Sequence, residues 1–228
     1  MVTCFHPGKK PVIRGVLFDM DGLVLDSEKL FCRFWVEAAN DMGFPMTFDH
    51  ALAMRGLGSS AGAEMIRRCL GPDADYFQIR NRRIRLMNAF VESHGIEPKP
   101  GIRQLLDYLQ ENHISAAITS SSPLDRIHYY LEPLELADRF DRLCSGHDMP
   151  NGKPAPDIYL HGAAVLGLKP EECLALEDAP AGIESAFRAG CSPVIIPDLD
   201  QPNEKTLSMC FARADSLTDV IGLLESLK

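Results

Sequence analysis

The 228-residue sequence has little of several features that mark particular classes of protein. It contains one tryptophan, and its seven cysteines are scattered, odd in number and without a CxxC pair. This pattern argues against a disulfide framework and a cysteine zinc site, and favours a cytoplasmic protein with reduced thiols. No stretch approaches the ~18 apolar residues of a membrane-spanning helix, and residues 1–11 lack the apolar segment of a signal peptide, so we expect no membrane partner.

Basic residues are also fewer than acidic ones. The chain has 23 Lys and Arg against 32 Asp and Glu, a net charge of −9, which argues against a nucleic-acid surface. With 46% hydrophobic and 24% charged residues, the composition is that of an ordinary soluble protein with one large domain or two small ones. An acidic protein that acts on an anionic substrate needs a local cation. The sequence does not indicate an oligomeric state.

The stretch Val12–Glu28, VIRGVLFDMDGLVLDSE, changes abruptly from apolar to acidic. Its first part is rich in β-branched and aromatic residues, which is typical of a strand buried on both faces of a parallel sheet. Asp19, Asp21 and Gly22 follow at what would be the carboxyl end of that strand. Because ligands of open α/β sheets bind beyond these strand ends, we expect a functional site here.

Asp19 and Asp21 lie two residues apart, so in an extended chain their side chains point to the same side. Two adjacent carboxylates repel each other unless a cation holds them or one is protonated. Mg²⁺, which takes one or two carboxylates plus a substrate phosphate, is the simplest solution. A plain surface turn at Gly22 is the alternative, although a buried strand leading into the acids disfavours it. A calcium loop of the EF-hand kind is excluded, because Val24 and Leu30 occupy the positions that require Gly and Glu.

Beyond this stretch the pattern of the chain changes twice. Residues 28–97 show helical spacing and no convincing buried strand, whereas helices and strands alternate from Pro98 onward. Such alternation predicts a doubly wound parallel sheet, and therefore an α/β fold. We expect a Rossmann-like α/β core formed by residues 11–27 and 98–228, with a helical cap domain, residues 28–97, inserted into it.

Apolar periodicity predicts the individual elements of both parts. Residues 1–11 are expected to be a tail, and the basic run Arg80–Arg85 is interpreted as a solvated helix face rather than an anion site. Helices are expected at about 28–42, 47–54, 60–70, 76–94, 102–112, 125–131, 158–166, 183–189 and 217–227, and strands at about 12–18, 114–119, 143, 173–176 and 193–197.

Three further strand ends of the expected core carry polar residues. The Thr119-Ser120-Ser121 segment offers hydroxyl and N–H groups for phosphate oxygens, Lys153 lies in a loop stiffened by two prolines, and Glu177-Asp178 is a second acidic pair. Each alone has an ordinary explanation as a turn, a surface lysine or a helix cap. Together the four strand ends supply the nucleophile, metal ligands, charge clamp and acid–base group that Mg²⁺-assisted phosphoryl transfer requires.

Four segments, FDMDGLVLDSE, ITSSS, GKPAPDIY and LEDAPAG, resemble in order and spacing the four motifs of the haloacid dehalogenase-like (HAD) hydrolases. Within that superfamily the chain is similar to the capped phosphatases and the β-phosphoglucomutase-like phosphomutases. The resemblance covers nearly the whole chain. It implies a Mg²⁺-dependent phosphoric monoester hydrolase that acts on a small phosphorylated metabolite, with a sugar phosphate favoured, through an aspartyl-phosphate. It also implies a sheet of order 5-4-1-2-3 and a cap inserted after the first motif.

The resemblance implies a role for each core residue. Asp19 corresponds to the nucleophile and a Mg²⁺ ligand, and we expect the metal and Lys153 to lower its pKa. Asp21 corresponds to the general acid and base, and its backbone carbonyl to a second Mg²⁺ ligand. Ser120 corresponds to the hydroxyl that binds the phosphate, with Thr119 as the alternative one residue earlier. Lys153 corresponds to the lysine that links the nucleophile to the phosphate.

The remaining site residues concern the metal and the substrate. By the same resemblance Asp178 corresponds to the last Mg²⁺ ligand. Glu177 either binds the metal directly or supports the residues that bind it. Substrate contacts are expected from Ser121 in the core and from Arg55 and Gly56 in the cap loop. Specificity should come from the cap, because the core recognises only the phosphate.

The phosphomutase alternative stays open on the sequence. Mutases that resemble this chain carry a His in the first cap helix and an Arg in the cap loop, where this sequence has Phe31 and either Ser59 or Ser60. Both departures favour the phosphatase, and the 26–28 segment, Asp-Ser-Glu, also resembles the sugar-phosphate phosphatases. Asp21 argues against the dehalogenases, which lack this second Asp. A metal-binding scaffold without activity is disfavoured, because every catalytic position is filled.

Overall fold

Short strands form the centre of the larger of two compact units in the computed structural model, which describes residues 1–5, 8, 10–55, 59–199 and 201–228. Within these residues the strands are β1 (Val2–Cys4), β2 (Gly15–Phe18), β3 (Ser115–Ser120), β4 (Arg142–Ser145), β5 (Cys173–Glu177), β6 (Ser192–Ile195) and β7 (Ala212–Ala214). They form one sheet in the order β1-β7-β6-β5-β2-β3-β4. Only β1 pairs antiparallel, with β7. The central β2 is buried along its whole length, as expected for a strand covered on both faces.

The five strands β6-β5-β2-β3-β4 have the predicted order 5-4-1-2-3, so the doubly wound parallel sheet is confirmed. The edge of the sheet contains two strands that were not predicted. Residues 2–4 form β1 instead of an irregular tail, and residues 212–214 form the unexpected β7, because three-residue strands are too short to show a period. In addition, the first core strand begins at Gly15 and not at Val12, whose side chain is 74% exposed.

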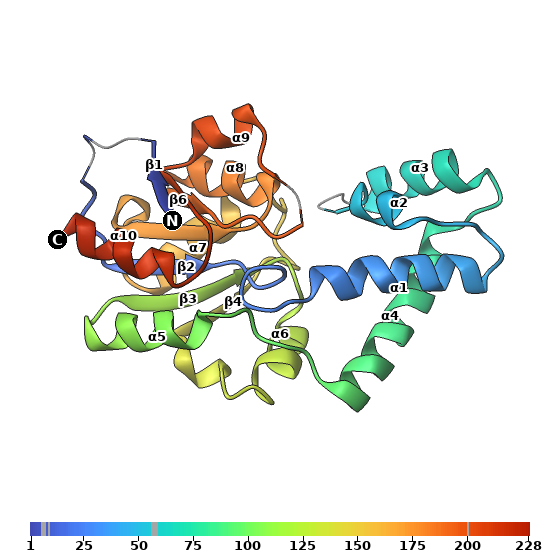
Figure 1. Cartoon of the computed structure of the whole chain (residues 1–228), viewed down its shortest axis with the longest axis horizontal. Helices are drawn as coiled ribbons and strands as arrows, with labels where there is room; N and C mark the ends of the chain where they lie inside the picture. The colour runs from blue at the N-terminus through green and yellow to red at the C-terminus, as the bar shows by residue number, and fades with distance from the viewer. Residues whose placement is uncertain (6–7, 9, 56–58, 200) are drawn as a thin grey trace. The chain divides into compact units, whose positions relative to one another are not determined.

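Helices cover both faces of this sheet (Figure 1). They are α5 (Ile102–Glu111), α6 (Leu124–Leu131), α7 (Asp157–Val165), α8 (Pro180–Ala189), α9 (Glu204–Met209) and α10 (Asp219–Leu227), with single 3₁₀ turns η1 (Ala137–Arg139) and η2 (Pro170–Glu172). α7 and α8 pack on β2, β3, β5 and β6, where Leu17, Ala117 and Ala175 meet Tyr159 and Ala163 in one buried cluster. α5 contacts β3 and α10, while α6 contacts β4. The packed sheet is thus a rigid support for the residues at the ends of its strands.

Residues 26–97 form the second compact unit, and their described regular structure is helical. The helices are α1 (Glu28–Asp41), α2 (Phe48–Leu52), α3 (Ser59–Leu70) and α4 (Tyr76–His94), close to the predicted bounds. α1 packs against α2 and α4, and α3 packs against α4. The Asp75 carboxylate caps α4 by accepting hydrogen bonds from the N–H groups of Phe77 and Gln78. Gly95, at a φ of 76°, ends it.

One prediction for the helical unit is wrong. Within the basic run on α4, the Arg83 side chain is buried rather than solvated, with 8% of the residue exposed. Its guanidinium carbon lies 5.0 Å from the ring centre of Phe31 and 5.3 Å from that of Trp35, both on α1. Arg85, on the same helix, is exposed. The helical period turns one arginine of the run inward, which a count of charges along the sequence does not reveal.

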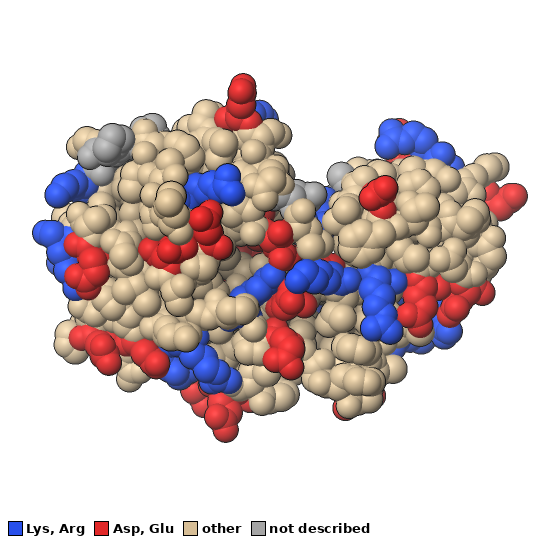
Figure 2. Space-filling model, viewed as in Figure 1, with Lys and Arg blue, Asp and Glu red and all other residues tan. Residues whose placement is uncertain are grey.

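Charges of both signs are mixed on the visible face of the molecule. Basic and acidic side chains are interspersed on the face shown in Figure 2, in keeping with the net charge of −9. Among the helices that the structure describes, none combines the length and the apolar composition that crossing a membrane requires.

Candidate active site

The carboxyl ends of three neighbouring strands bring the candidate catalytic residues together. β2 pairs in parallel with β3 and β5, and Phe18 lies opposite both Ile118 and Leu176. The residues that follow each of these positions therefore lie at one level, with Asp19 and Glu177 on neighbouring strands. Polar segments more than 150 residues apart in the sequence become one cluster in this way.

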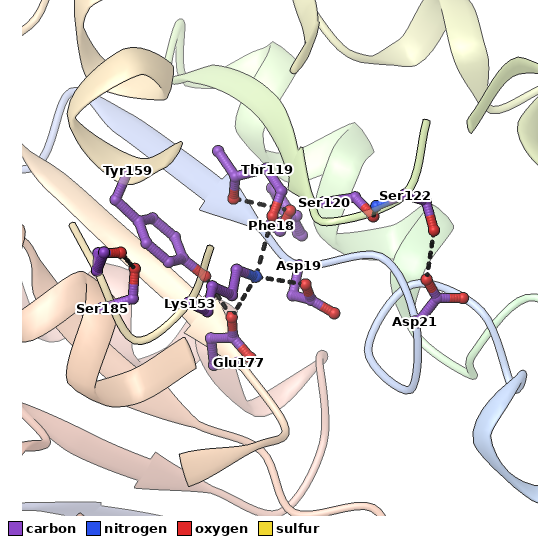
Figure 3. A network of polar contacts seen from close by, with 11 residues as sticks. Phe18, Asp19, Asp21, Thr119, Ser120, Ser122, Lys153, Tyr159, Glu177 and Ser185 are labelled. Atoms are coloured by element: carbon purple, nitrogen blue, oxygen red, sulfur yellow. Dashed lines mark hydrogen bonds and ion pairs between the residues drawn. The ribbon is translucent and has the colours of Figure 1, made fainter. Parts of the chain in front are cut away.

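Lys153 is the centre of this cluster (Figure 3). Its Nζ donates hydrogen bonds to Asp19 Oδ1 and Glu177 Oε1, each at 2.6 Å, and to the Thr119 carbonyl at 3.1 Å. The side chains of Lys153, Asp19 and Glu177 are 10%, 13% and 2% exposed, respectively. The ammonium group is therefore a fixed positive charge, satisfied by three oxygens and shielded from solvent.

Tyr159 and Ser185 support this arrangement, and the sequence interpretation missed both roles. The Tyr159 hydroxyl donates to the same Glu177 Oε1 at 2.5 Å, and its ring lies 5.1 Å from Lys153 Nζ. Ser185 Oγ donates to the carbonyl of Ala155 at 2.5 Å, which ties the lysine loop to α8. Tyr159 is visible in GKPAPDIY as a residue on the first turn of the helix that follows Lys153, but its direction depends on how α7 packs.

The buried charges shift one another's pKa values. Burial raises the pKa of Asp19 to about 8; Lys153 opposes this shift, while Glu177 and Asp21 add to it. Although burial lowers the pKa of Lys153, the carboxylates of Asp19 and Glu177 raise it more, so this pKa lies well above its usual range. Lys153 thus stays charged, but by itself it does not hold Asp19 ionised. A further positive charge is needed for Asp19 to act as a nucleophile at neutral pH.

Three carboxylates of the cluster are suited to a metal ion. Asp19, Glu177 and Asp178 each offer a buried oxygen, and these oxygens lie within 4.8 Å of one another. When all three are ionised, Lys153 compensates one of the three negative charges and two remain, which matches a divalent cation. Oxygen donors alone suit Mg²⁺ rather than a softer metal. The residues present therefore fit the magnesium ion that the sequence predicts.

Gly182, on the first turn of α8, makes room for the Glu177 carboxylate. A Cβ at this position would fall 1.8 Å from Glu177 Oε1 and 1.9 Å from its carboxyl carbon. No side chain fits there, and the close approach brings the carboxylate to the amino-terminal end of α8, where the helix dipole favours negative charge. The glycine of LEDAPAG is thus required by its contact with Glu177 and not by its own backbone angles.

The two candidate hydroxyl residues of β3 point to different partners. Thr119 is buried, and its Oγ1 donates to the Phe18 carbonyl at 3.1 Å, within the sheet. Ser120 Oγ accepts a hydrogen bond from the N–H of Ser122 at 3.1 Å. The Thr119 hydroxyl proton is therefore already donated to a backbone carbonyl, and this favours Ser120 as the residue whose hydroxyl binds the phosphate. Ser121 is exposed.

Asp21 and Asp178 complete the set of core candidates. Asp21 lies in the turn after β2 and its Oδ2 accepts a hydrogen bond from Ser122 Oγ at 3.2 Å, a partner that the sequence interpretation did not include. Asp178 directly follows β5 and is 6% exposed. The strand ends thus bring Asp19, Lys153, Glu177 and Asp178 into one buried group, with Asp21 beside Ser122.

The helical unit contains a cavity of its own, of about 140 Å³. Arg55, a predicted substrate residue, lines it and donates from Nε to Glu28 Oε2 at 2.7 Å, with side chains 12% and 16% exposed. Gly56, the other predicted cap residue, lies outside the described residues, whereas Ser59 and Ser60 are exposed at the start of α3. The cavity walls include Glu28, Phe31, Cys32, Trp35, Arg55 and Arg83.

Comparison with known proteins agrees with the fold. A family model described as haloacid dehalogenase-like hydrolase matches residues 16–196, a range that includes β3, β4, β5 and β6, the cluster and the helical unit. The chain belongs to this family of hydrolases.

Named relatives narrow the class of enzyme. The chain is 32% identical over 212 residues to hexitol phosphatase A of Escherichia coli, covering 90% of this chain and 93% of that protein. It is 30% identical over 178 residues to a phosphorylated carbohydrates phosphatase of Thermotoga maritima, covering 78% and 82%. A crystal structure of β-phosphoglucomutase from Clostridium difficile shares the fold at a TM-score of 0.75 and 22% identity, covering 94% and 97%. The chain is accordingly an enzyme of this family, and both named phosphatases are phosphoric monoester hydrolases.

Proposed function

We propose that this protein is a Mg²⁺-dependent phosphatase that hydrolyses a small phosphorylated metabolite through an aspartyl-phosphate on Asp19. A phosphorylated sugar or sugar alcohol is the favoured substrate, since the named relatives are phosphatases of hexitol phosphates and phosphorylated carbohydrates. The observation that carries the proposal is the buried contact of Lys153 with both Asp19 and Glu177, each at 2.6 Å, beside the Asp178 carboxylate. The group supplies a nucleophile, a fixed cation and metal ligands in one place.

The proposed reaction has two steps, both centred on Asp19. In the first, a carboxylate oxygen of Asp19 bonds to phosphorus while the ester P–O bond breaks, and the leaving oxygen takes a proton from Asp21. In the second, Asp21 takes a proton from water, whose oxygen bonds to phosphorus as the bond to Asp19 breaks. Inorganic phosphate and the Asp19 carboxylate are the products, so Asp21 serves first as acid and then as base.

The other core residues orient and stabilise the phosphoryl group. Lys153 stays protonated and offers positive charge to the phosphate oxygens next to Asp19. Ser120 donates its hydroxyl proton to the phosphate. Asp19, Asp178 and the Asp21 carbonyl would hold Mg²⁺, with Glu177 as a direct ligand or a helper, and the ion would supply the charge that keeps Asp19 ionised and neutralises the phosphate.

We further propose that the helical unit serves as the cap and recognises the leaving group. Its cavity combines two arginines, one glutamate and two aromatic rings, which suits a hydroxylated ligand. Arg55 contributes through its bond to Glu28, and Gly56 belongs to the same predicted loop. The phosphomutase is the less favoured alternative, because Phe31 stacks on Arg83 and offers no polar contact to a second sugar.

The test is release of inorganic phosphate from a panel of phosphorylated sugars, sugar alcohols and other metabolites, with and without MgCl₂. The wild-type protein should release phosphate only with Mg²⁺, and Asp19→Asn should lower kcat by at least about a thousandfold, because it keeps the shape but removes the attacking charge. Asp107→Asn, on an exposed ion pair, is the matched control. Near-normal turnover by Asp19→Asn would refute the covalent mechanism. Conversion of β-glucose 1-phosphate to glucose 6-phosphate faster than phosphate release would favour the mutase.

A further inference from the structure

Ser122 joins the ends of three strands through both its side chain and its backbone, and Figure 3 shows it beside Asp21 and Ser120. Its Oγ donates to Asp21 Oδ2 at 3.2 Å, beyond β2. Its N–H donates to Ser120 Oγ at 3.1 Å, at the end of β3. Its carbonyl accepts a hydrogen bond of 2.8 Å from Ser145 Oγ, at the end of β4. One serine thus contacts the candidate acid–base residue and the candidate phosphate-binding residue together.

The backbone around Asp21 is fixed, but its side chain needs a separate support. The turn is closed by hydrogen bonds from Val24 N–H and Leu25 N–H to the Met20 carbonyl, each 3.0 Å long, and Met20, Val24 and Leu25 are fully buried. These bonds set where the Asp21 backbone lies, yet they leave the torsion about its Cα–Cβ bond open. The bond from Ser122 Oγ selects one direction for the carboxyl group. At 3.2 Å it is long, as catalytic hydrogen bonds of a free enzyme often are.

The backbone of Ser122 acts on Ser120 in a comparable way. A hydroxyl group has one proton to donate and two lone pairs that accept. Because the Ser122 N–H occupies a lone pair of Ser120 Oγ, the Ser120 proton remains to be donated elsewhere. A phosphate oxygen is the acceptor that the proposed function supplies. The bond between Ser145 and the Ser122 carbonyl holds the peptide that provides both contacts.

We infer that Ser122 is a positioning residue of the phosphatase: its hydroxyl aims Asp21 at the leaving oxygen, and its N–H turns the Ser120 hydroxyl toward the phosphate. The inference rests on the proposed function. It concerns the step in which the ester P–O bond breaks and its electron pair goes to the leaving oxygen, which takes the Asp21 proton. A leaving group that is stable as an anion departs readily without this proton, whereas departure of an alkoxide depends strongly on it.

The inference therefore predicts an effect that depends on the leaving group. The probes are p-nitrophenyl phosphate, whose phenolate departs readily, and a hexitol 6-phosphate, whose alkoxide does not. We compare kcat/KM, which reports the steps up to loss of the leaving group. Ser122→Ala should lower kcat/KM about tenfold for the hexitol phosphate and less than about threefold for p-nitrophenyl phosphate, because only the alkoxide depends strongly on the proton that Asp21 donates. Ser122→Thr, which keeps the hydroxyl, should restore most of the loss.

Ser208→Ala is the matched control, because Ser208 is exposed and donates only to a carbonyl of its own helix, α9, among the contacts described. It should leave both substrates unaffected. Equal losses with the two substrates in Ser122→Ala would indicate a structural effect and overturn the inference, and so would unchanged kinetics in an active enzyme.

A structural measurement separates this inference from the proposed function. If the wild-type protein releases phosphate from neither probe nor from the wider panel, the proposed function fails. Crystal structures of the wild type and Ser122→Ala then decide whether Ser122 positions Asp21. We expect the Asp21 carboxyl to leave its wild-type direction in the variant. An unchanged, equally ordered Asp21 would overturn the inference whatever the activity.

Discussion

Lys153 in the strand-end cluster and Arg83 in the helical unit are both buried cations, but their surroundings differ. Lys153 donates to two carboxylates at 2.6 Å, whereas Arg83 stacks on two aromatic rings at 5.0 and 5.3 Å. Close ion pairs in a buried site repay their desolvation cost only with good geometry, so they define one arrangement. Stacking on rings is weaker and tolerates more than one geometry. Under the proposed function, the first environment would serve the chemical step and the second would serve ligand selection.

The two regions also differ in how their residues are supported. The cluster lies at the ends of fully buried strands, with Tyr159, Ser185 and Gly182 fixing its members from α7 and α8. The cavity of the helical unit is lined by side chains from α1, α2 and α4, and from Arg55 at the edge of a segment that the structure leaves undescribed. Changes in the cluster should therefore affect turnover, and changes in the cavity should affect substrate choice. Four variants test this comparison.

The largest effect is expected from Lys153→Met, which removes the fixed positive charge but keeps a side chain of similar shape. Loss of one preorganised donor to a developing charge typically costs about 10²–10³ in kcat, and here Asp19 would also lose its nearest positive charge. Steady-state kinetics with p-nitrophenyl phosphate and MgCl₂ measures the loss. Lys205→Met, at a side chain 78% exposed, should keep full activity. A Lys153→Met enzyme within tenfold of the wild type would show that the cluster does not depend on this charge.

Gly182→Ala should come next, because the new Cβ collides with the Glu177 carboxylate. Overpacking of this kind costs ~1–3 kcal/mol of unfolding free energy, and moving Glu177 disturbs Lys153 as well. Urea denaturation and Mg²⁺-dependent kinetics should both show the loss. Gly222→Ala in α10 is the matched control, since a Cβ there meets nothing within 4 Å, and it should stabilise the protein by about 0.5–1 kcal/mol. Equal stability of the two variants would contradict the close approach.

Asp178→Ala tests the metal site without relying on activity. Mg²⁺ at about a hundred times its Kd should stabilise the wild type by ~2.7 kcal/mol, and so raise Tm by several degrees. The variant should show little or no such rise in Tm. It lacks one metal ligand, and its remaining carboxylates, Asp19 and Glu177, carry less negative charge in excess of the positive charge of Lys153. Thermal unfolding monitored by circular dichroism, with and without MgCl₂, gives the comparison. The same rise in both proteins would exclude Asp178 as a ligand.

The smallest effect is expected in the helical unit. Arg83→Met should raise KM for the preferred sugar or sugar-alcohol phosphate by about tenfold, as for loss of one polar substrate contact, and leave kcat within about twofold. With p-nitrophenyl phosphate, KM should change little. Arg85→Met, on the exposed side of the same helix, should alter neither constant. A loss of kcat equal to that of Lys153→Met would erase the proposed division between chemistry and recognition.

The two regions were not equally predictable from the sequence. Strong local signals mark the core: Asp19 and Asp21 directly follow an apolar strand, and Lys153 and Glu177-Asp178 occur at the expected strand ends. The inner strand order was also predicted correctly. The burial of Arg83 was not, because all the arginines of its run look alike until α4 packs against α1. β1 and β7 were missed, since short edge strands depend on pairing with a neighbour rather than on their own pattern.

The amino-acid sequence alone determined the alternation of elements, the helical insertion and the residues predicted to perform phosphoryl transfer, because period, turn residues and charged strand ends are local properties. Only the tertiary structure decided which neighbouring side chains hold these site residues in place. Thr119 bonds within the sheet while Ser120 bonds to Ser122, Tyr159 reaches Glu177, and Gly182 leaves space for that carboxylate. Those contacts join residues from different strands and helices, so they exist only once parallel strand ends and packed helices bring distant parts of the chain within hydrogen-bond distance.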